Sequence, residues 1–431
     1  MKRSLLLALL VLAVIAAPAL TVTRAADVTI HVLTMDQAAM TTDEMDAVAS
    51  EFEAANPGVT VEMEYIAYDN LHDKFVTAMA TNPPPYDVVM VDVVWYDEFI
   101  NAGYIADVTD MVNTGIPDKD KIFPTAWNVV TRNGKAYGLP WLLDTKYLYY
   151  NIDLLKQAGF DAPPATWEEL VTQAKAIKDK GLVEYPIVWS WAQAEAAICD
   201  FTALLYGNGG SYLDSDGKAV FNDEKGVATL DWMVKSIDDG LTNPASITDL
   251  EEDVRNVFSS GKAAFALNWL YMYDKANFDQ NESTITGKVG LTTIPVFGSA
   301  KLSDKSASVD GSSGFSIAAN SPNQQVAFDF IKFLTSEPIQ MKYSAHQLPI
   351  WSTSYEGDNL KTLESFSASG PVAVPMFKDQ FSFAHVRPTV SYYLEASKAL
   401  QLALQEALTK QKTPKEALDA AAAKWAELAG K

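Results

Sequence analysis

Indole rings placed near carboxylates are the groups in this chain best suited to recognising another molecule. The sequence contains ten tryptophans, and several follow strand-like segments or stand in loops bounded by Gly, Pro or Ser. A flat indole suits the C–H face of a sugar ring, whose hydroxyls can then meet Asp, Glu, Asn or Arg. The tryptophans in such positions are Trp95, Trp141, Trp191, Trp269 and Trp351.

The same residues raise the alternative of a secreted glycosidase. Such an enzyme needs two carboxyl groups on either side of one glycosidic bond, and Asp92, Asp144 and Glu195 are the candidates for that pair. The residues alone leave this alternative open. They predict neither a metal nor a cofactor, because the four histidines are scattered without paired ligand spacing.

Charge and chain ends restrict the compartment and the partners. The formal net charge of −22 argues against nucleic acid and anionic membrane surfaces as partners. A basic start, an apolar stretch over 5–17 and small residues at Ala25 and Ala26 are typical of a secretory signal over residues 1–26. A lipid anchor would need a cysteine just after the signal, and the single cysteine is Cys199. We therefore expect a soluble protein without a lipid anchor. Its expected location is extracellular or, preferably, periplasmic.

The pattern of apolar residues predicts an α/β fold. Segments 28–32 and 59–65 alternate as strands do, and they flank a helix that stops at Asn56-Pro57-Gly58. Segment 86–91 is almost wholly apolar, as expected of a buried parallel strand. Strands that alternate with helices in this way favour parallel sheets covered by helices.

Six short segments, spread over nearly the whole chain after the signal, carry a more specific pattern. They are EFEAANPGV at 51–59, YDVVMVD at 86–92 with GYI at 103–105, GKAYGLP at 134–140 running on to LYYN at 148–151, PATWEEL at 164–170, FSSGKAAF at 258–265 and FIKFLTSE at 330–337. In their order and spacing they resemble the extracellular solute-binding proteins of ABC importers, in the family that includes maltose-binding protein.

The resemblance implies a two-lobed periplasmic-binding-protein fold of type II. Each lobe is expected to be a mostly parallel sheet flanked by helices, with the ligand cleft between the lobes. Lobe 1 would contain residues 27–143 and 311–358, and lobe 2 residues 144–310 and 359–431. Such proteins close around a solute by hinge motion and deliver it to a membrane permease. This implied role argues against the glycosidase, and we expect a monomer without enzymatic activity.

The resemblance and the predicted strand ends point to eleven ligand contacts. Asp144 stands where similar proteins place a binding acid at the crossover between lobes, and Trp269 where they often place a stacking indole. Asp92 and Trp95 follow a strand whose carboxyl end should face the cleft. The remaining candidates are Trp191, Glu195, Arg387, Tyr271, Gly311, Asp36 and Trp351.

Several of these candidates also have a purely structural alternative. The tryptophans would then pack in the core, Asp92 would cap a helix, Arg387 would form an ion pair, and Asp144 would pair with Lys146 at the surface. Stacking faces and hydroxyl partners together favour a mono- or oligosaccharide as the ligand. A polyamine is the alternative, because carboxylates and indoles also bind cations.

Overall fold

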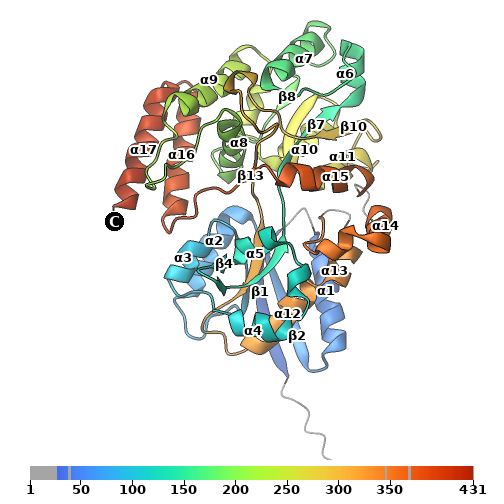
Figure 1. Ribbon diagram of the computed structural model, residues 1–431, viewed down its shortest axis with the longest axis vertical. Coiled ribbons are helices and arrows are strands. Elements are labelled where there is room, and N and C mark those ends of the chain that lie inside the picture. Colours follow the sequence, from blue (N-terminus) through green and yellow to red (C-terminus); the bar gives the residue numbers. More distant parts are fainter. Residues whose placement is uncertain (1–26, 37–39, 345–346, 367–369, 431) are drawn as a thin grey trace, which may run out of the picture.

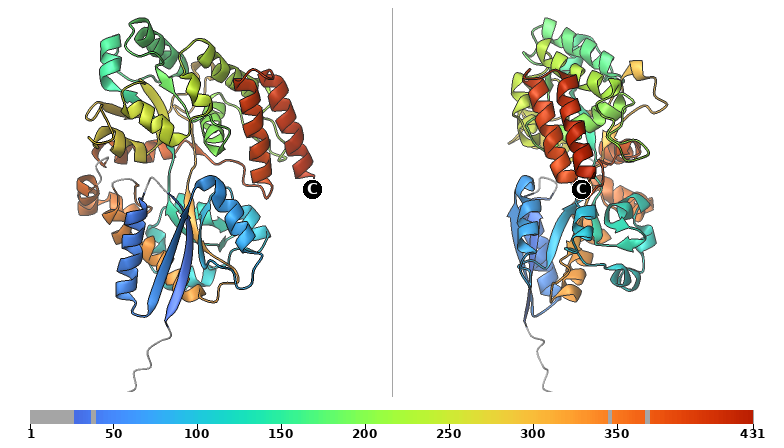
Figure 2. Two further views of the ribbon diagram at one scale, coloured as in Figure 1. Left: turned by 180° about the vertical axis from the view of Figure 1, so that it is seen from behind. Right: turned by 90° about the vertical axis from the view of Figure 1, so that its left-hand side faces the viewer.

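The chain folds into two lobes joined near the middle of the molecule (Figure 1). The structure is a computed structural model that describes residues 27–36, 40–344, 347–366 and 370–430, so the predicted signal over 1–26 lies outside it. A five-stranded sheet forms the centre of lobe 1, and a four-stranded sheet forms the centre of lobe 2. Helices surround both sheets, as the views in Figure 2 show. The predicted two-lobed α/β architecture is confirmed.

The sheet of lobe 1 is mixed. From edge to edge its strands are β2 (Val59–Ile66), β1 (Val28–Met35), β3 (Val88–Asp92), β12 (Ser313–Ile317) and β6 (Leu139–Leu142). Strand β1 runs parallel to β2 and β3, as the alternating and apolar segments predicted. Strand β12 runs antiparallel to both of its neighbours.

The sheet of lobe 2 corrects the expectation of mostly parallel sheets. Its strands are, in order, β10 (Val289–Thr292), β7 (Lys146–Asn151), β9 (Phe265–Trp269) and β8 (Ile187–Val188). Only β8 and β9 are parallel, whereas β7 is antiparallel to both neighbours. Strands β7 and β12 each bring the chain in from the other lobe without a helical crossover. A buried apolar run does not reveal the direction of such a strand.

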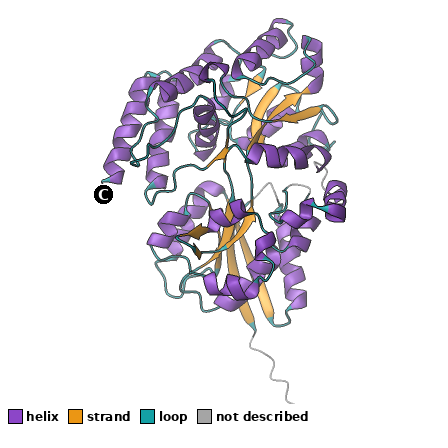
Figure 3. Cartoon of the chain, viewed as in Figure 1, coloured by secondary structure: helices purple, strands orange, loops and turns teal. Residues whose placement is uncertain are grey.

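Helices complete each lobe (Figure 3). Helix α1 shows how the sequence sets their ends: Thr41 and Glu44 form a capping box, and Met45, Val48 and Phe52 bury one face. The other elements of lobe 1 are α2 (Tyr68–Ala78), α3 (Tyr96–Asn101), α4 (Thr109–Gly115), η1 (Lys119–Lys121), α5 (Pro124–Val130), β4 (Thr131–Arg132), β5 (Lys135–Ala136), α12 (Gln324–Leu334), α13 (Glu337–Lys342), η4 (Ser352–Tyr355) and α14 (Gly357–Phe366); helix α1 itself covers Thr42–Ala55.

Lobe 2 also contains helices around its sheet. They are α6 (Ile152–Ala158), α7 (Trp167–Asp179), α8 (Glu195–Gly207), α9 (Glu224–Asp238), η2 (Pro244–Ile247), α10 (Glu251–Ser259), α11 (Tyr271–Asn277), η3 (Gly298–Ala300), α15 (Gly370–Phe381), α16 (Tyr393–Leu408) and α17 (Pro414–Ala429). Helices α16 and α17 pack on each other at the flank of the lobe (Figure 2). No helix in the described part of the chain is long and apolar enough to span a membrane.

Two of the short segments that carry the chain between the lobes lie side by side. Residues 143–145 join β6 to β7, and residues 310–312 join β11 (Ser308–Val309) to β12; β11 itself pairs with β13 (Ala384–His385). An isolated bridge links Thr145 to Asp310, and the Gly311 amide donates a 3.0 Å hydrogen bond to the Asp144 carbonyl. The boundaries drawn from the sequence at 143/144, 310/311 and 358/359 stay a prediction.

Candidate functional site

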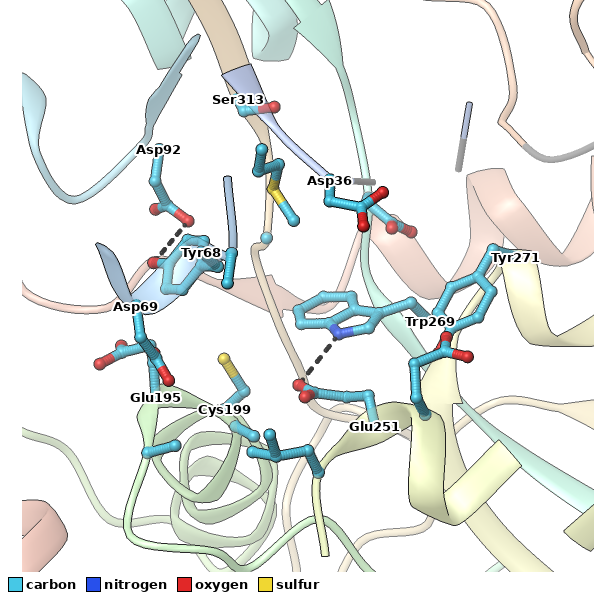
Figure 4. A pocket seen from close by; sticks show the side chains of 18 of the residues that line it. Asp36, Tyr68, Asp69, Asp92, Glu195, Cys199, Glu251, Trp269, Tyr271 and Ser313 are labelled. Atoms are coloured by element: carbon cyan, nitrogen blue, oxygen red, sulfur yellow. Dashed lines mark hydrogen bonds between the residues drawn. The ribbon is translucent and has the colours of Figure 1, made fainter. Parts of the chain in front are cut away.

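A cavity of about 440 Å³ lies where the two lobes meet the crossing segments (Figure 4). Both lobes contribute side chains to its walls, so it has the place expected of the ligand cleft. Its lining consists of Met35, Asp36, Ala67, Tyr68, Asp69, Met90, Asp92, Leu142 and Ser313 from lobe 1, Asp144 and Gly311 from the crossing segments, and Ala194, Glu195, Ala196, Cys199, Leu250, Glu251, Glu252, Asp253, Trp269, Tyr271 and Arg387 from lobe 2.

Trp269 presents a firmly held indole to this cavity. It ends strand β9, its Nε1 donates a 3.3 Å hydrogen bond to Glu251 Oε1 (Figure 4), and its carbonyl accepts a 2.6 Å hydrogen bond from the Tyr149 hydroxyl. The edge of the ring lies so close to Gly311 that a Cβ on this glycine would be 2.4 Å from Trp269 Cζ3. Glycine at position 311 therefore leaves room for the indole itself, a role that the sequence did not reveal.

A buried lysine supports Trp269 from the adjacent strand. Lys146 pairs with Trp269 in the register of β7 and β9, and its Nζ lies 5.1 Å from the ring centroid. The ammonium is wholly buried and binds Asp200 Oδ1 at 2.7 Å and Ser190 Oγ at 3.1 Å. Burial raises the pKa of Asp200 to about 6 despite this partner. Lys146 is thus not the surface partner of Asp144 that the structural alternative supposed.

Asp144 lies between the lobes, at the first crossing segment. Its Oδ1 accepts a 2.9 Å hydrogen bond from the Thr145 amide, and its side chain lines the cavity. Burial raises the pKa of Asp144 to about 7, and the charge of Asp310 acts in the same direction. This carboxyl group therefore changes its protonation near neutral pH.

Arg387, Asp92 and Glu195 form one buried ion-pair network. Arg387 Nη2 lies 3.0 Å from Asp92 Oδ1 at the end of β3, and Arg387 Nη1 lies 2.7 Å from Glu195 Oε1 at the start of α8. Asp92 also accepts a 3.1 Å hydrogen bond from Tyr68, and Ser397 donates a 2.5 Å hydrogen bond to Glu195. Arg387 is only 2% exposed.

This network changes how the three residues were expected to act. Each was predicted as a separate partner for ligand hydroxyls, whereas here the guanidinium holds both carboxylates and so connects lobe 1 with lobe 2. Burial alone would lower the pKa of Arg387, but the charges of Asp92 and Glu195 raise it. The arginine is therefore charged over the whole physiological range.

Three predicted indoles lie away from the cavity. Trp95 is 3% exposed and stacks on Tyr68, with ring centroids 5.1 Å apart, so that Tyr68 takes the place at the cavity wall. Trp191 is wholly buried in lobe 2, stacked on Trp189 at 5.0 Å. Trp351 donates a 2.9 Å hydrogen bond to the Thr335 carbonyl and borders a separate hollow of about 180 Å³ in lobe 1.

The structure brings the other eight predicted residues together at the cavity: Asp36, Asp92, Asp144, Glu195, Trp269, Tyr271, Gly311 and Arg387. Sequence reasoning missed Tyr68, Asp69, Glu251 and Ser313, which line the same space. A signal for Tyr68 and Asp69 was present, because they begin the helix after β2. Among the described residues, no three His, Cys, Asp or Glu side chains converge as a metal site requires.

Residues 38–341 match the family described as bacterial extracellular solute-binding protein. The chain belongs to this family. A probable ABC transporter-binding protein of Deinococcus radiodurans is 32% identical to it over 359 residues, which cover 80% of each chain. The resemblance to solute-binding proteins of ABC importers is therefore confirmed.

Solved structures of this kind are similar over nearly their full length. Maltose-bound MalE3 of T. maritima superposes with a TM-score of 0.83 and is 30% identical, covering 93% of this chain and 99% of that one. A solute-binding protein of Agrobacterium radiobacter K84 in complex with ribitol has a TM-score of 0.82 and 25% identity, covering 94% and 99%. The type II two-lobed fold follows from these superpositions.

Proposed function

We propose that this protein captures a sugar or a polyol in the cavity between its lobes and delivers it to the permease of an ABC transporter. The observation that carries the proposal is Trp269, a half-buried indole held in place at a cavity lined by carboxylates of both lobes. The cavity of about 440 Å³ suits a small molecule. Maltose and ribitol occupy the two similar structures.

Different lining residues contact different groups of the ligand. Trp269 supplies a face for the C–H groups of the ligand, and Asp144 and Asp36 accept hydrogen bonds from its hydroxyls. The crossing segments around Asp144 and Gly311 act as the hinge. A ligand that touches both lobes binds the closed form more strongly than the open form, and this difference drives closure.

We further propose that the protein does not catalyse a reaction. Of the carboxylates that a glycosidase would use, Asp92 and Glu195 are both bound to Arg387. Neither is then free to act as the separate acid and base on opposite sides of a bond that glycoside hydrolysis requires. Export, a monomeric state and release of the solute to a permease complete the proposal.

A thermal-shift screen of the exported protein tests this function. The panel contains maltose, ribitol, tagatose, mannitol and arabino-oligosaccharides, with spermidine as the polyamine alternative. A ligand that binds only the folded state raises the Tm by mass action, and the rise should disappear in Trp269→Ala. A rise with spermidine alone would contradict the sugar or polyol assignment, and consumption of a sugar would contradict a purely binding role.

A further inference from the structure

The charge of the cavity suggests a narrower class of ligand. Its lining contains eight carboxylates but a single cationic side chain, Arg387. We propose that the ligand is a sugar or polyol that carries a protonated amine, a proposal that rests on the proposed function. An ammonium group forms charge-assisted hydrogen bonds with carboxylates, which are stronger than the bonds of a neutral hydroxyl.

Three cations near the cavity are already bound to protein carboxylates, whereas a fourth, Lys398, forms no ion pair with a described residue, and its charge partly offsets the rise that burial causes in the pKa of Asp69. Arg387 is shared by Asp92 and Glu195. Arg255, one turn into α10, lies 2.8 Å from Glu252. Lys146 is bound to Asp200 at 2.7 Å and lies 3.5 Å from Glu251, and it is not one of the residues that line the cavity. These three cations therefore leave much of the negative charge at the cavity uncompensated.

The remaining carboxylates belong to both lobes. Asp36 and Asp69 line the cavity from lobe 1, Asp144 from the hinge, and Asp253 from lobe 2, and none of the four forms an ion pair with another described residue. In Figure 4 the side chains of Asp69, Glu195 and Glu251 border the same space. Burial and then the charge of Glu251 raise the pKa of Asp69, so the two carboxylates influence each other across the cavity.

This arrangement makes closure depend on charge. Like charges on opposite walls oppose the approach of the lobes, and a protonated amine between them reverses the sign of that interaction. A cationic ligand thereby gains more in the closed form than a neutral one, which is the condition for driving the closure. The net charge of −22 also favours the encounter with a cation over that with a neutral or anionic solute.

Other polar groups at the cavity favour a ligand that carries hydroxyl groups as well as an amine. Ser313 Oγ and Arg387 Nε belong to side chains that line the cavity and are 3% and 2% exposed. Neither atom has a hydrogen-bond partner within the described part of the structure. Buried polar atoms of this kind are normally satisfied, and a hydroxyl can serve both, as donor or acceptor. A polyamine without hydroxyls cannot accept from Arg387, which favours an amino sugar or amino polyol.

Matched pairs of ligands test the proposal by isothermal titration calorimetry. The pairs are sorbitol with glucamine, and glucose with glucosamine, and N-acetylglucosamine adds a form in which the amine is uncharged. The amine of at least one pair should bind about tenfold or more tightly than its neutral counterpart. High salt should weaken this preference, and a pH above the pKa of the ligand amine should abolish it.

Variants locate the charge that is responsible. Asp69→Asn and Asp253→Asn should each reduce the ratio of amine to neutral affinity by about tenfold. Asp358→Asn changes the net charge equally, but its side chain is 96% exposed on α14, and it should leave the ratio unchanged. Equal loss of preference in Asp358→Asn would assign the effect to the overall charge and overturn the role of the cavity.

The outcomes separate this proposal from the proposed function. If the neutral member of each pair binds as tightly as the amine or more tightly, the proposal of an amine-bearing ligand is wrong, and the proposed capture of a sugar or polyol still stands. Binding of neither member of any pair, with binding of spermidine, would overturn both. Tighter binding of the amines that is reduced by Asp69→Asn and Asp253→Asn supports both proposals.

Discussion

The two walls of the cavity differ in how firmly their functional side chains are held. On the wall of lobe 2, Trp269 is fixed through its indole N–H by Glu251 and supported by the buried Lys146. On the wall of lobe 1, Asp36 follows the end of β1 and Asp69 begins α2, and both side chains are exposed. Lobe 1 also holds Tyr68 and Asp92 in place. We therefore expect the indole of lobe 2 to receive the ligand first, and the exposed Asp36 and Asp69 of lobe 1 to add their contacts on closure.

Removing the lysine behind Trp269 should have the largest effect. Lys146→Met leaves Asp200 buried without its cation, which should lower the free energy of unfolding by about 3–5 kcal/mol. The paired variant Lys146→Met with Asp200→Asn removes both charges and should recover most of this loss in chemical denaturation. Ligand affinity should stay reduced in the paired variant, because the indole has lost its support. Full recovery of affinity would show that Lys146 serves stability alone.

Truncating one aromatic residue on each wall sharpens the comparison. Trp269→Ala should weaken binding of the cognate ligand by about 2–3 kcal/mol, because a rigid, half-buried indole is lost from a prepared surface. Tyr68→Ala on the wall of lobe 1 should cost less, about 1 kcal/mol of binding. Calorimetric titration measures both. Equal losses, or a larger loss for Tyr68→Ala, would contradict the assignment of lobe 2 as the receiving surface.

Adding a single methyl group at the hinge tests the position of the indole. A Cβ at Gly311 would be 2.4 Å from Trp269 Cζ3, so Gly311→Ala must displace the ring, at a cost of about 1–2 kcal/mol in stability together with weaker binding. Gly207→Ala is the matched control, since outside its own helix the nearest atom to its Cβ would be the Pro295 carbonyl oxygen, at 3.6 Å. Denaturation and titration of both variants give the comparison. Unchanged binding in Gly311→Ala would mean that the ring position is unimportant.

The smallest effect is expected from the carboxyl group between the walls. Burial raises the pKa of Asp144 to about 7, so the folded protein holds a proton that the unfolded chain has already lost. Its contribution to stability is then fully present below about pH 4 and is lost as the pH rises through 7. Asp144→Asn lacks this titration and should gain about 1 kcal/mol relative to the parent between pH 6 and pH 8. Parallel pH profiles of unfolding would contradict the raised pKa.

The sequence predicted the fold better than the site, for physical reasons. Alternating apolar and polar residues in segments such as 28–32 and 59–65 predict strands, and the predicted order of strand, helix and strand is observed as β1, α1 and β2. Strand direction in lobe 2 was predicted wrongly, because antiparallel pairing of β7 depends on where the chain enters the lobe rather than on residues within the strand.

Whether an indole lies in the core or at the cavity depends on contacts between segments that are distant in the sequence. Trp191 and Trp269 both follow short apolar strands, yet Trp191 is stacked on Trp189 in the core and Trp269 reaches the cavity. The charged network shows the same limit. Arg387 binds Asp92 and Glu195, which are far from it in the sequence. No local sequence pattern could therefore show that both terminal nitrogens of its guanidinium are bound to protein carboxylates.

The strand order of lobe 1 has a consequence for how the chain folds. Strand β12 lies between β3 and β6, so β6 has no place in the sheet until residues 313–317 are available. The sheet of lobe 2, in contrast, is built entirely from residues 146–292. We therefore expect the sheet of lobe 2 to form first and the sheet of lobe 1 to form later, although lobe 1 contains the start of the folded chain. Pairings over such long sequence separations fold slowly, so under the proposed export the chain would have time to cross the membrane before it becomes compact.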